Sequence, residues 1–246
     1  MIYKNDFLQQ FRDADESGRL SARGYLNYFQ NEASVLMHNM RRGNDTLPYE
    51  FRIAWLYTKY RLENIRPAGF DVPLHAETWI SSKGPVKLNT DYELTRNGEL
   101  ICCGRLESCL YHVDKKQLQP IKAVSLPEDA VEDRRTRVGA FSRPSVDSSI
   151  MDKAYEYTVR YADLDNNRHM TNLSYGPLFI NAFGPELYAD HYIKTFEIHY
   201  LNQSYYGESL SVLFHLEESR AELYALKADG TKAAWCLMEF GFSDQL

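Results

Sequence analysis

The side chains best suited to chemistry in this 246-residue sequence gather in one ten-residue segment, Asp163–Asn172. It holds two carboxylates, several amides and one imidazole. Carboxylates and imidazoles activate water by accepting its proton, and N–H donors stabilise the charge that develops on a carbonyl oxygen. Asp165, Asn167 and His169 alternate, so an extended backbone would direct their side chains to one side. We therefore expect a hydrolytic centre here.

Residues of these types also fold loops and cap helices, so the segment has a purely structural interpretation as well. Asp and Asn side chains readily accept main-chain N–H groups in turns and at helix starts. For Asp163 and Asn172 we favour this structural role. For Asp165, Asn167 and His169 we favour chemistry, with main-chain N–H groups at the start of the following helix as donors to the carbonyl oxygen.

Two helices are expected, each ahead of a strand-rich region. Segment Ser21–Met40 places apolar residues at steps of three and four, which predicts a helix with one buried face and Ser21 as its N-cap. The apolar positions are Leu26, Phe29, Ala33, Leu36, Met37 and Met40. A second helix is expected from about Tyr175 to Phe183. Because proline is tolerated only in a first turn, Pro177 predicts that this helix begins near Ser174.

Runs rich in aromatic and β-branched residues follow each helix and predict strands. They are Arg52–Leu62, Leu74–Ser81, Val86–Thr95 and Glu99–Val113 in the first half, and Lys194–Asn202, Ser209–Leu216, Glu222–Ala228 and Lys232–Phe242 in the second. Asn97-Gly98 and Asp229-Gly230 are strong signals for the turns of β-hairpins.

The two halves repeat one plan of loop, helix and strands. Their openings align when Phe11–Asp15 is laid over Val159–Asp163 at an offset of 148. We therefore predict an α+β protein of two tandem domains, each a long central helix wrapped by an antiparallel β-sheet. The expected division is 1–118 for the N-terminal domain, 119–149 for a linker rich in proline, serine and charge, and 150–246 for the C-terminal domain.

Composition excludes several classes of protein. The formal net charge of −6 argues against a general nucleic-acid-binding protein, which needs a basic face. The N-terminus has no apolar export signal and no stretch is long enough for a membrane span, so we expect a cytoplasmic protein. The four cysteines lack metal-ligand spacing, so buried free thiols are expected and neither a metal nor an organic cofactor is.

The loop resembles that of the acyl-acyl-carrier-protein (acyl-ACP) thioesterases, in which Asp-Leu-Asp-x-Asn-x-His-x-x-Asn follows a strand in the second of two hot-dog domains. All fixed positions of that pattern are present between Asp163 and Asn172. The resemblance extends over most of the chain, including Gln30–Ala33, Trp55–Glu63 and Trp79. It implies that Asp165 is the catalytic aspartate, as the second aspartate is in simpler hot-dog thioesterases.

The same resemblance implies a Tyr-x-x-Glu-Cys stretch whose glutamate joins the catalytic set. Here the matching stretch is Tyr200–Ser204, in which Gln203 and Ser204 replace Glu and Cys. The implied site is therefore Asp165 as general base or nucleophile, with His169 as orienter and proton carrier. Asn167 would position the thioester and Gln203 would be an accessory, since an amide is no base.

The resemblance further implies fatty acyl-ACP as substrate and the first domain as the place of the acyl tail. Leu36, Met37 and Met40 could line its tunnel, although core packing is the more common role of such residues. Basic clusters around Arg41-Arg42 or Arg134–Arg137 could meet the acidic carrier. A hot-dog dehydratase or hydratase and a catalytically weak acyl-binding module remain alternatives. Chain length, carrier protein versus coenzyme A, and monomer versus homodimer stay open.

Overall fold

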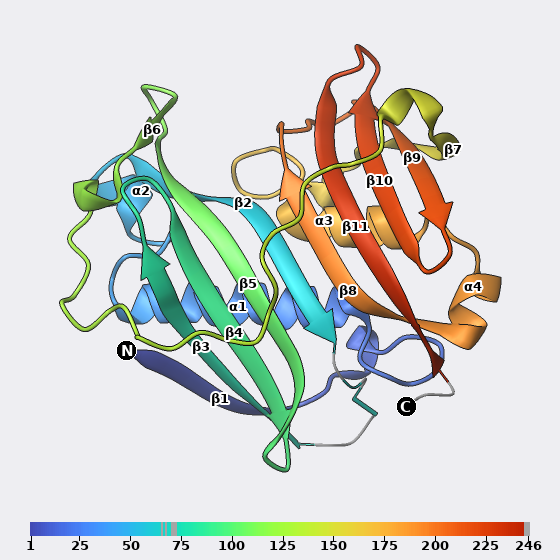
Figure 1. Cartoon of the computed structure of the whole chain (residues 1–246). Coiled ribbons are helices and arrows are strands. Elements are labelled where there is room, and N and C mark those ends of the chain that lie inside the picture. Colours follow the sequence, from blue (N-terminus) through green and yellow to red (C-terminus); the bar gives the residue numbers. More distant parts are fainter. Residues whose placement is uncertain (65, 67, 70–72, 244–246) are drawn as a thin grey trace. The chain divides into compact units, whose positions relative to one another are not determined.

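The computed structural model describes residues 1–64, 66, 68–69 and 73–243, and the chain divides into two compact units. Unit 1 spans Met1–Gly139 and unit 2 spans Ala140–Leu246. The boundary falls inside the segment that the sequence analysis assigns to the linker. Each unit contains a helix against an antiparallel sheet (Figure 1), which confirms the predicted α+β class and tandem hot-dog arrangement.

Unit 1 is built on an antiparallel sheet in the order β1-β3-β4-β5-β2, with β6 paired to β5. Its elements are β1 Ile2–Leu8, α1 Ala22–Asn39, α2 Leu47–Glu50, β2 Ile53–Asn64, β3 Pro73–Lys83, β4 Leu88–Arg96, β5 Glu99–His112 and β6 Gln117–Gln119. Short 3₁₀ helices occupy Phe11–Asp13 and Ile121–Ala123. The four strands predicted in this half are therefore confirmed, and two further strands are added.

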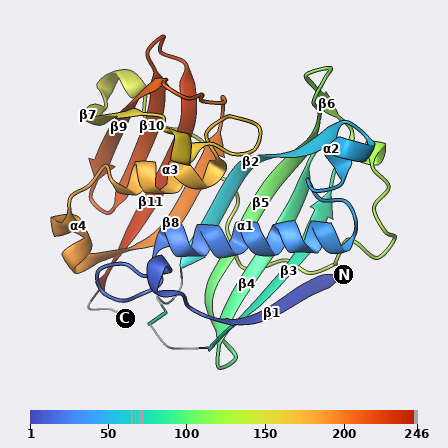
Figure 2. The same ribbon diagram turned by 180° about the vertical axis from the view of Figure 1, so that it is seen from behind.

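Helix α1 forms as its periodicity predicts, and it lies across one face of the unit 1 sheet (Figure 2). Ser21 is the N-cap, and its hydroxyl accepts the N–H of Gly24. The apolar stripe is buried, with the ring of Phe29 packed against those of Tyr60 and Tyr92. A Cβ atom at Gly104 would lie 3.6 Å from the Phe29 ring and 3.2 Å from a strand carbonyl, so glycine lets this ring approach the sheet.

The two predicted hairpin turns are also present. Asn97 and Gly98 have φ angles of 51° and 80°, and both residue types tolerate this left-handed region that a two-residue hairpin turn requires. At the second turn only Gly230 is left-handed, with φ of 81°, and Asp229 accepts the N–H of Thr231. That loop is accordingly longer than two residues.

Unit 2 has the sheet order β8-β11-β10-β9-β7. Its elements are β7 Asp152–Thr158, α3 Asn172–Ile180, α4 Pro185–Asp190, β8 His191–Tyr200, β9 Ser209–Glu217, β10 Arg220–Lys227 and β11 Lys232–Phe242, with 3₁₀ helices at Ser148–Ile150 and Tyr161–Asp163. The predicted start of α3 near Ser174 is wrong, because the helix begins at Asn172 and carries Pro177 inside it. Pro177 has no main-chain N–H to donate to the preceding turn, and the helix ends three residues later at Ile180, before the separate α4.

The structure corrects the register of the internal repeat from an offset of 148 to one of 150. Strands β1 and β7 begin at Ile2 and Asp152, and the 3₁₀ helices that follow begin at Phe11 and Tyr161. Isolated bridges then join Ala14 to Leu20 in unit 1 and Leu164 to Met170 in unit 2. The sequence analysis missed both strands because each is a half-exposed edge strand in which polar residues blur the alternation.

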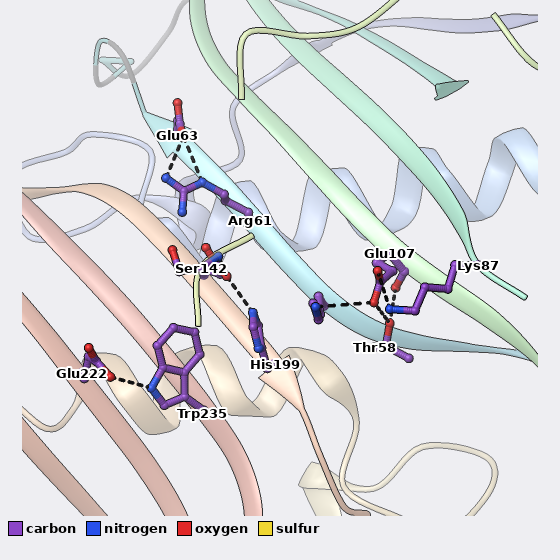
Figure 3. A network of polar contacts seen from close by, with 11 residues as sticks. Thr58, Arg61, Glu63, Lys87, Glu107, Ser142, His199, Glu222 and Trp235 are labelled. Carbon is purple, nitrogen blue, oxygen red and sulfur yellow. Dashed lines mark hydrogen bonds and ion pairs between the residues drawn. The ribbon is translucent and has the colours of Figure 1, made fainter. Parts of the chain in front are cut away.

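The connecting segment 120–146 is bound to both sheets by carboxylates that accept its main-chain N–H groups. In unit 1, Glu63 accepts the N–H of Gly139 and Asp91 that of Thr136. In unit 2, Glu222 accepts those of Ser145 and Val146. Figure 3 shows Glu63 beside Arg61 and, within unit 2, Glu222 beside Trp235. The segment is therefore hydrogen-bonded to the sheet of each unit.

The same segment is also attached to unit 1 by the ion pair of Arg134 with Glu77. This pair makes the stability of unit 1 depend on pH. Burial would raise the pKa of Glu77, but hydrogen bonds from Lys4 and Arg134 outweigh it and lower that pKa to about 2. The folded state therefore favours ionised Glu77, and this stabilisation is complete above the unfolded pKa of about 4.3 and is lost as pH falls toward 2.

We predict that Glu77→Gln destabilises the protein at pH 7 and flattens the decline of stability between about pH 5 and pH 3. Urea unfolding at several pH values measures both effects. Glu99→Gln is the matched control, because Glu99 forms an exposed pair with Arg66 that contributes little. Parallel pH curves for the parent and Glu77→Gln would contradict the assignment.

Candidate active site

The segment Asp163–Asn172 forms a tight turn between a 3₁₀ helix and α3. The N–H of Asp165 donates to the His169 carbonyl at 2.9 Å, and the N–H of Arg168 donates to the Asp165 carbonyl at 3.1 Å. Arg168 has a φ angle of 66° in the left-handed region. The expectation of an extended backbone with three side chains on one side is therefore wrong, and a turn brings the chemical groups together instead.

The carboxylate of Asp165 has two different oxygen environments. Oδ1 accepts the main-chain N–H of Asn167 at 2.8 Å and, more weakly, that of His169 at 3.4 Å. Oδ2 lies 3.3 Å from Nδ1 of His169. The side chains of Asp165 and His169 are 26% and 18% exposed, so water can reach the pair. The main chain of the loop thus binds one carboxylate oxygen, and the other oxygen lies beside the imidazole.

The other two predicted site residues, Asn167 and Gln203, are exposed and lie on two segments that meet through main-chain contacts. His169 forms an isolated antiparallel bridge with Tyr205, and the N–H of Met170 donates to the Ser204 carbonyl at 2.7 Å. The Tyr205 hydroxyl donates to Oε1 of Gln203 at 2.9 Å. The structure therefore joins Asp165 directly to His169 and brings Gln203 near them only through its backbone neighbours.

The two ends of the loop, Asp163 and Asn172, have different roles. Oδ2 of Asp163 accepts the N–H of Arg160 and the hydroxyl of Tyr157, both at 2.7 Å, and thereby closes the loop. Asn172 is the first helical residue and not the N-cap, which is Thr171. Its N–H and that of the next residue lie in the first turn of α3, where the helix itself supplies no acceptor, so they are candidate donors to a carbonyl oxygen.

Ser204 is fully buried and accepts a hydrogen bond from the Tyr175 hydroxyl at 3.0 Å. Burial raises the pKa of Tyr175 to about 12, so the phenol remains a donor at neutral pH. A hydroxyl held in this way inside the core is poorly placed to act as a nucleophile. Its role is to join the segment before β9 to α3.

Unit 1 contains the same turn with different side chains. Oδ1 of Asp15 accepts the N–H groups of Ser17 at 2.9 Å and Arg19 at 3.1 Å, and Gly18 has a φ angle of 75°. The predicted turn-forming role of Asp15 is confirmed. At the offset of 150 residues, Ser17 and Arg19 occupy the places of Asn167 and His169. The turn is thus a shared framework, whereas the carboxylate and imidazole pair belongs to unit 2.

Unit 1 holds a cavity of about 300 Å³. Its lining comes from α1, the loop that follows it and the sheet, and includes Ala33, Met37, Trp55, Tyr57 and Leu106. Of the three residues proposed for an acyl tunnel, Met37 reaches this cavity. All three, including Leu36 and Met40, belong to the hydrophobic core.

The sequence analysis missed Tyr205, whose main chain pairs with His169 and whose hydroxyl holds Gln203. Its position one residue after the Tyr200–Ser204 stretch was the only available signal. The four cysteines are free and buried, as predicted. Among the described residues, no cluster of three or more His, Cys, Asp or Glu side chains could hold a metal ion, and no helix is long and apolar enough to cross a bilayer.

Comparison with known proteins shows similarity to acyl-ACP thioesterases. Residues 147–237 match the family model described as the acyl-ACP thioesterase C-terminal domain. No curated protein matches the chain. Among solved structures, an acyl-ACP thioesterase from Bacteroides thetaiotaomicron has a TM-score of 0.90 at 21% identity, with 98% of each chain covered.

Two further structures share the fold along almost the whole chain. The 12:0-ACP thioesterase from Umbellularia californica has a TM-score of 0.83 at 16% identity and covers 98% of both chains. A Lactobacillus plantarum protein described as an oleoyl thioesterase has a TM-score of 0.82 at 15% identity, covering 98% of this chain and 96% of its own. Through the matched C-terminal domain, the chain is identified as a thioester hydrolase that resembles the acyl-ACP thioesterases.

Proposed function

We propose that the protein hydrolyses fatty acyl-ACP and releases free fatty acid in fatty acid biosynthesis. The observation that supports this most is the carboxylate of Asp165, held by main-chain N–H groups through one oxygen and placed 3.3 Å from His169 through the other. The acyl-ACP thioesterases named above share the fold over nearly the entire chain. We also propose that the protein acts in the cytoplasm.

In the proposed reaction, Asp165 acts as general base and takes a proton from water while the water oxygen attacks the thioester carbonyl. His169 orients the carboxylate and carries the proton to the leaving thiolate. Asn167 positions the thioester, and the amide of Gln203 orients water or substrate. The N–H groups of the first turn of α3 stabilise the negative charge on the carbonyl oxygen. Direct attack by Asp165 on the carbonyl is the alternative first step.

The cavity of unit 1 is the proposed place for the acyl tail. Its volume of about 300 Å³ lies at the lower end of the range typical of small-molecule sites. Trp55, Leu106 and Met37 give it an apolar part against which an acyl chain would pack.

We predict that Asp165→Asn lowers turnover by about 10²- to 10⁴-fold, because an amide cannot accept the proton of water. Thiol release from acyl-ACP measures this and separates hydrolysis from hydration and from simple acyl binding. Asp15→Asn is the matched control, since it alters the equivalent turn of unit 1 and should leave turnover near that of the parent. Ser204→Ala should also retain most activity. Full activity of a folded Asp165→Asn variant would refute the assignment.

Preference for the carrier protein can be tested through salt. Lys59, Arg61 and Arg66 are already paired with carboxylates, whereas Arg135 and Arg137 are exposed on the connecting segment. If such cations steer an acidic carrier, kcat/KM on acyl-ACP should fall with rising salt, and kcat/KM on a small acyl thioester should change much less. Equal salt dependence for both substrates would argue against an electrostatic carrier site.

The replacement of glutamate by Gln203 yields a further prediction. If Asp165 is the only base, Gln203→Glu adds a like charge near the site, and activity near neutral pH should change little or fall. If the mechanism instead uses a glutamate at this position, the same change should raise kcat by roughly tenfold, about 1.4 kcal/mol of barrier. A pH–rate profile of the parent and Gln203→Glu distinguishes the two. We expect the first outcome.

A further inference from the structure

One end of unit 1 combines positive charge with exposed apolar side chains. We call residues 41–52, 83–87 and 112–122 the basic end. Because the sheet is antiparallel, the C-termini of β3 and β5 and the N-termini of β2 and β4 meet at this end. Both views show α2, the β3–β4 turn and the β5–β6 hairpin there (Figures 1 and 2).

The charge of the basic end opposes that of the whole protein. Its ranges hold eight lysines and arginines against three carboxylates, in a chain whose net charge is −6. Some of the cations are neutralised internally, such as Arg52 by Asp114 and Lys87 by Glu107. Six others form no ion pair with any part of the chain that the structure describes, and these are Arg41, Arg42, Lys83, Lys115, Lys116 and Lys122. Of these, Arg42 donates to the main-chain carbonyls of Arg41 and Ser125.

Four large apolar side chains project among these cations. Tyr49 is 79% exposed, Leu118 61%, Phe51 48% and Val86 46%. They stand on α2 and its end, the β3–β4 turn and β6. Beside them, a pocket of about 390 Å³ opens between the β3–β4 turn and the 3₁₀ helix at Ile121–Ala123. Pro85, Pro120 and Ile121 line it together with Lys83 and Lys122.

We propose that the basic end docks on the surface of a bilayer that contains anionic lipids. Lysines next to an anionic surface are attracted electrostatically, and exposed apolar side chains gain by entering the boundary between headgroups and acyl chains. The apolar side chains stand on three separate elements and none of them lines the pocket, which suits a fluid surface better than a folded partner. Most of the unpaired cations are lysines, whose compact charges fit diffuse headgroups.

Sedimentation of the full chain with lipid vesicles tests the proposal. The chain should bind vesicles of phosphatidylcholine mixed in equal parts with phosphatidylglycerol, release them as salt rises, and bind pure phosphatidylcholine weakly. Lys83→Glu/Lys122→Glu should reduce binding to the mixed vesicles by at least about tenfold. The matched control Arg135→Glu/Arg137→Glu changes net charge equally outside the basic end and should reduce it much less.

A second pair of variants tests the apolar contribution without changing charge. Val86→Ser/Leu118→Ser should weaken binding to mixed vesicles, whereas Leu201→Ser/Leu216→Ser, exposed residues of unit 2, should not. Circular dichroism verifies that each variant is folded. Absence of binding by the parent at low salt, or equal losses in variants and controls, would overturn the proposal. A third result would also overturn it: the parent does not bind vesicles, and Lys83→Glu/Lys122→Glu raises KM for acyl-ACP. The partner of the basic end would then be an acidic protein.

Discussion

The site depends on a carboxylate that accepts main-chain N–H groups within its own turn. Asp165 folds the loop by binding the N–H of Asn167, and this turn places the imidazole of His169 beside the second carboxylate oxygen. A carboxylate can accept several hydrogen bonds, so the same group can order the backbone and still take part in chemistry. The turn also sets where α3 begins, because Thr171 donates its N–H to the Asp163 carbonyl directly before the helix.

The same turn occurs in unit 1 without the carboxylate and imidazole pair, so the turn itself does not require these side chains. Asp15 binds its own backbone as Asp165 does, but Ser17 and Arg19 stand in the places of the amide and the imidazole. Unit 1 instead has a longer helix and a cavity beside it. In unit 2 the helix is short, and the loop brings the carboxylate of Asp165 to the imidazole of His169. One framework thus supports a pocket beside the helix in one copy and a carboxylate–imidazole pair in the other.

Carboxylates on the sheets perform a second structural task by holding the connecting segment. Asp91 is fully buried, receives both arms of Arg105 and also accepts the N–H of Thr136. Such a group is stable in the interior only because charge and hydrogen bonds compensate its loss of water. Several carboxylates of the chain therefore bind its own backbone, whereas Lys83, Lys115, Lys116 and Lys122 of the basic end form no ion pair with the described residues.

The sequence by itself determined the features that follow from short-range rules. The stripe and Ser21 cap of α1, the Asn97-Gly98 turn and the residue types of the Asp163–Asn172 loop all depend on neighbours within a few positions. Only the tertiary structure decided the helical position of Pro177, the edge strands, the repeat register of 150 and the contact between Asp165 and His169. An edge strand forms because it pairs with a strand far along the chain. A turn changes the side-chain directions that an extended backbone would give. Neither effect produces a local periodicity of residue types, so the sequence pattern could not predict it.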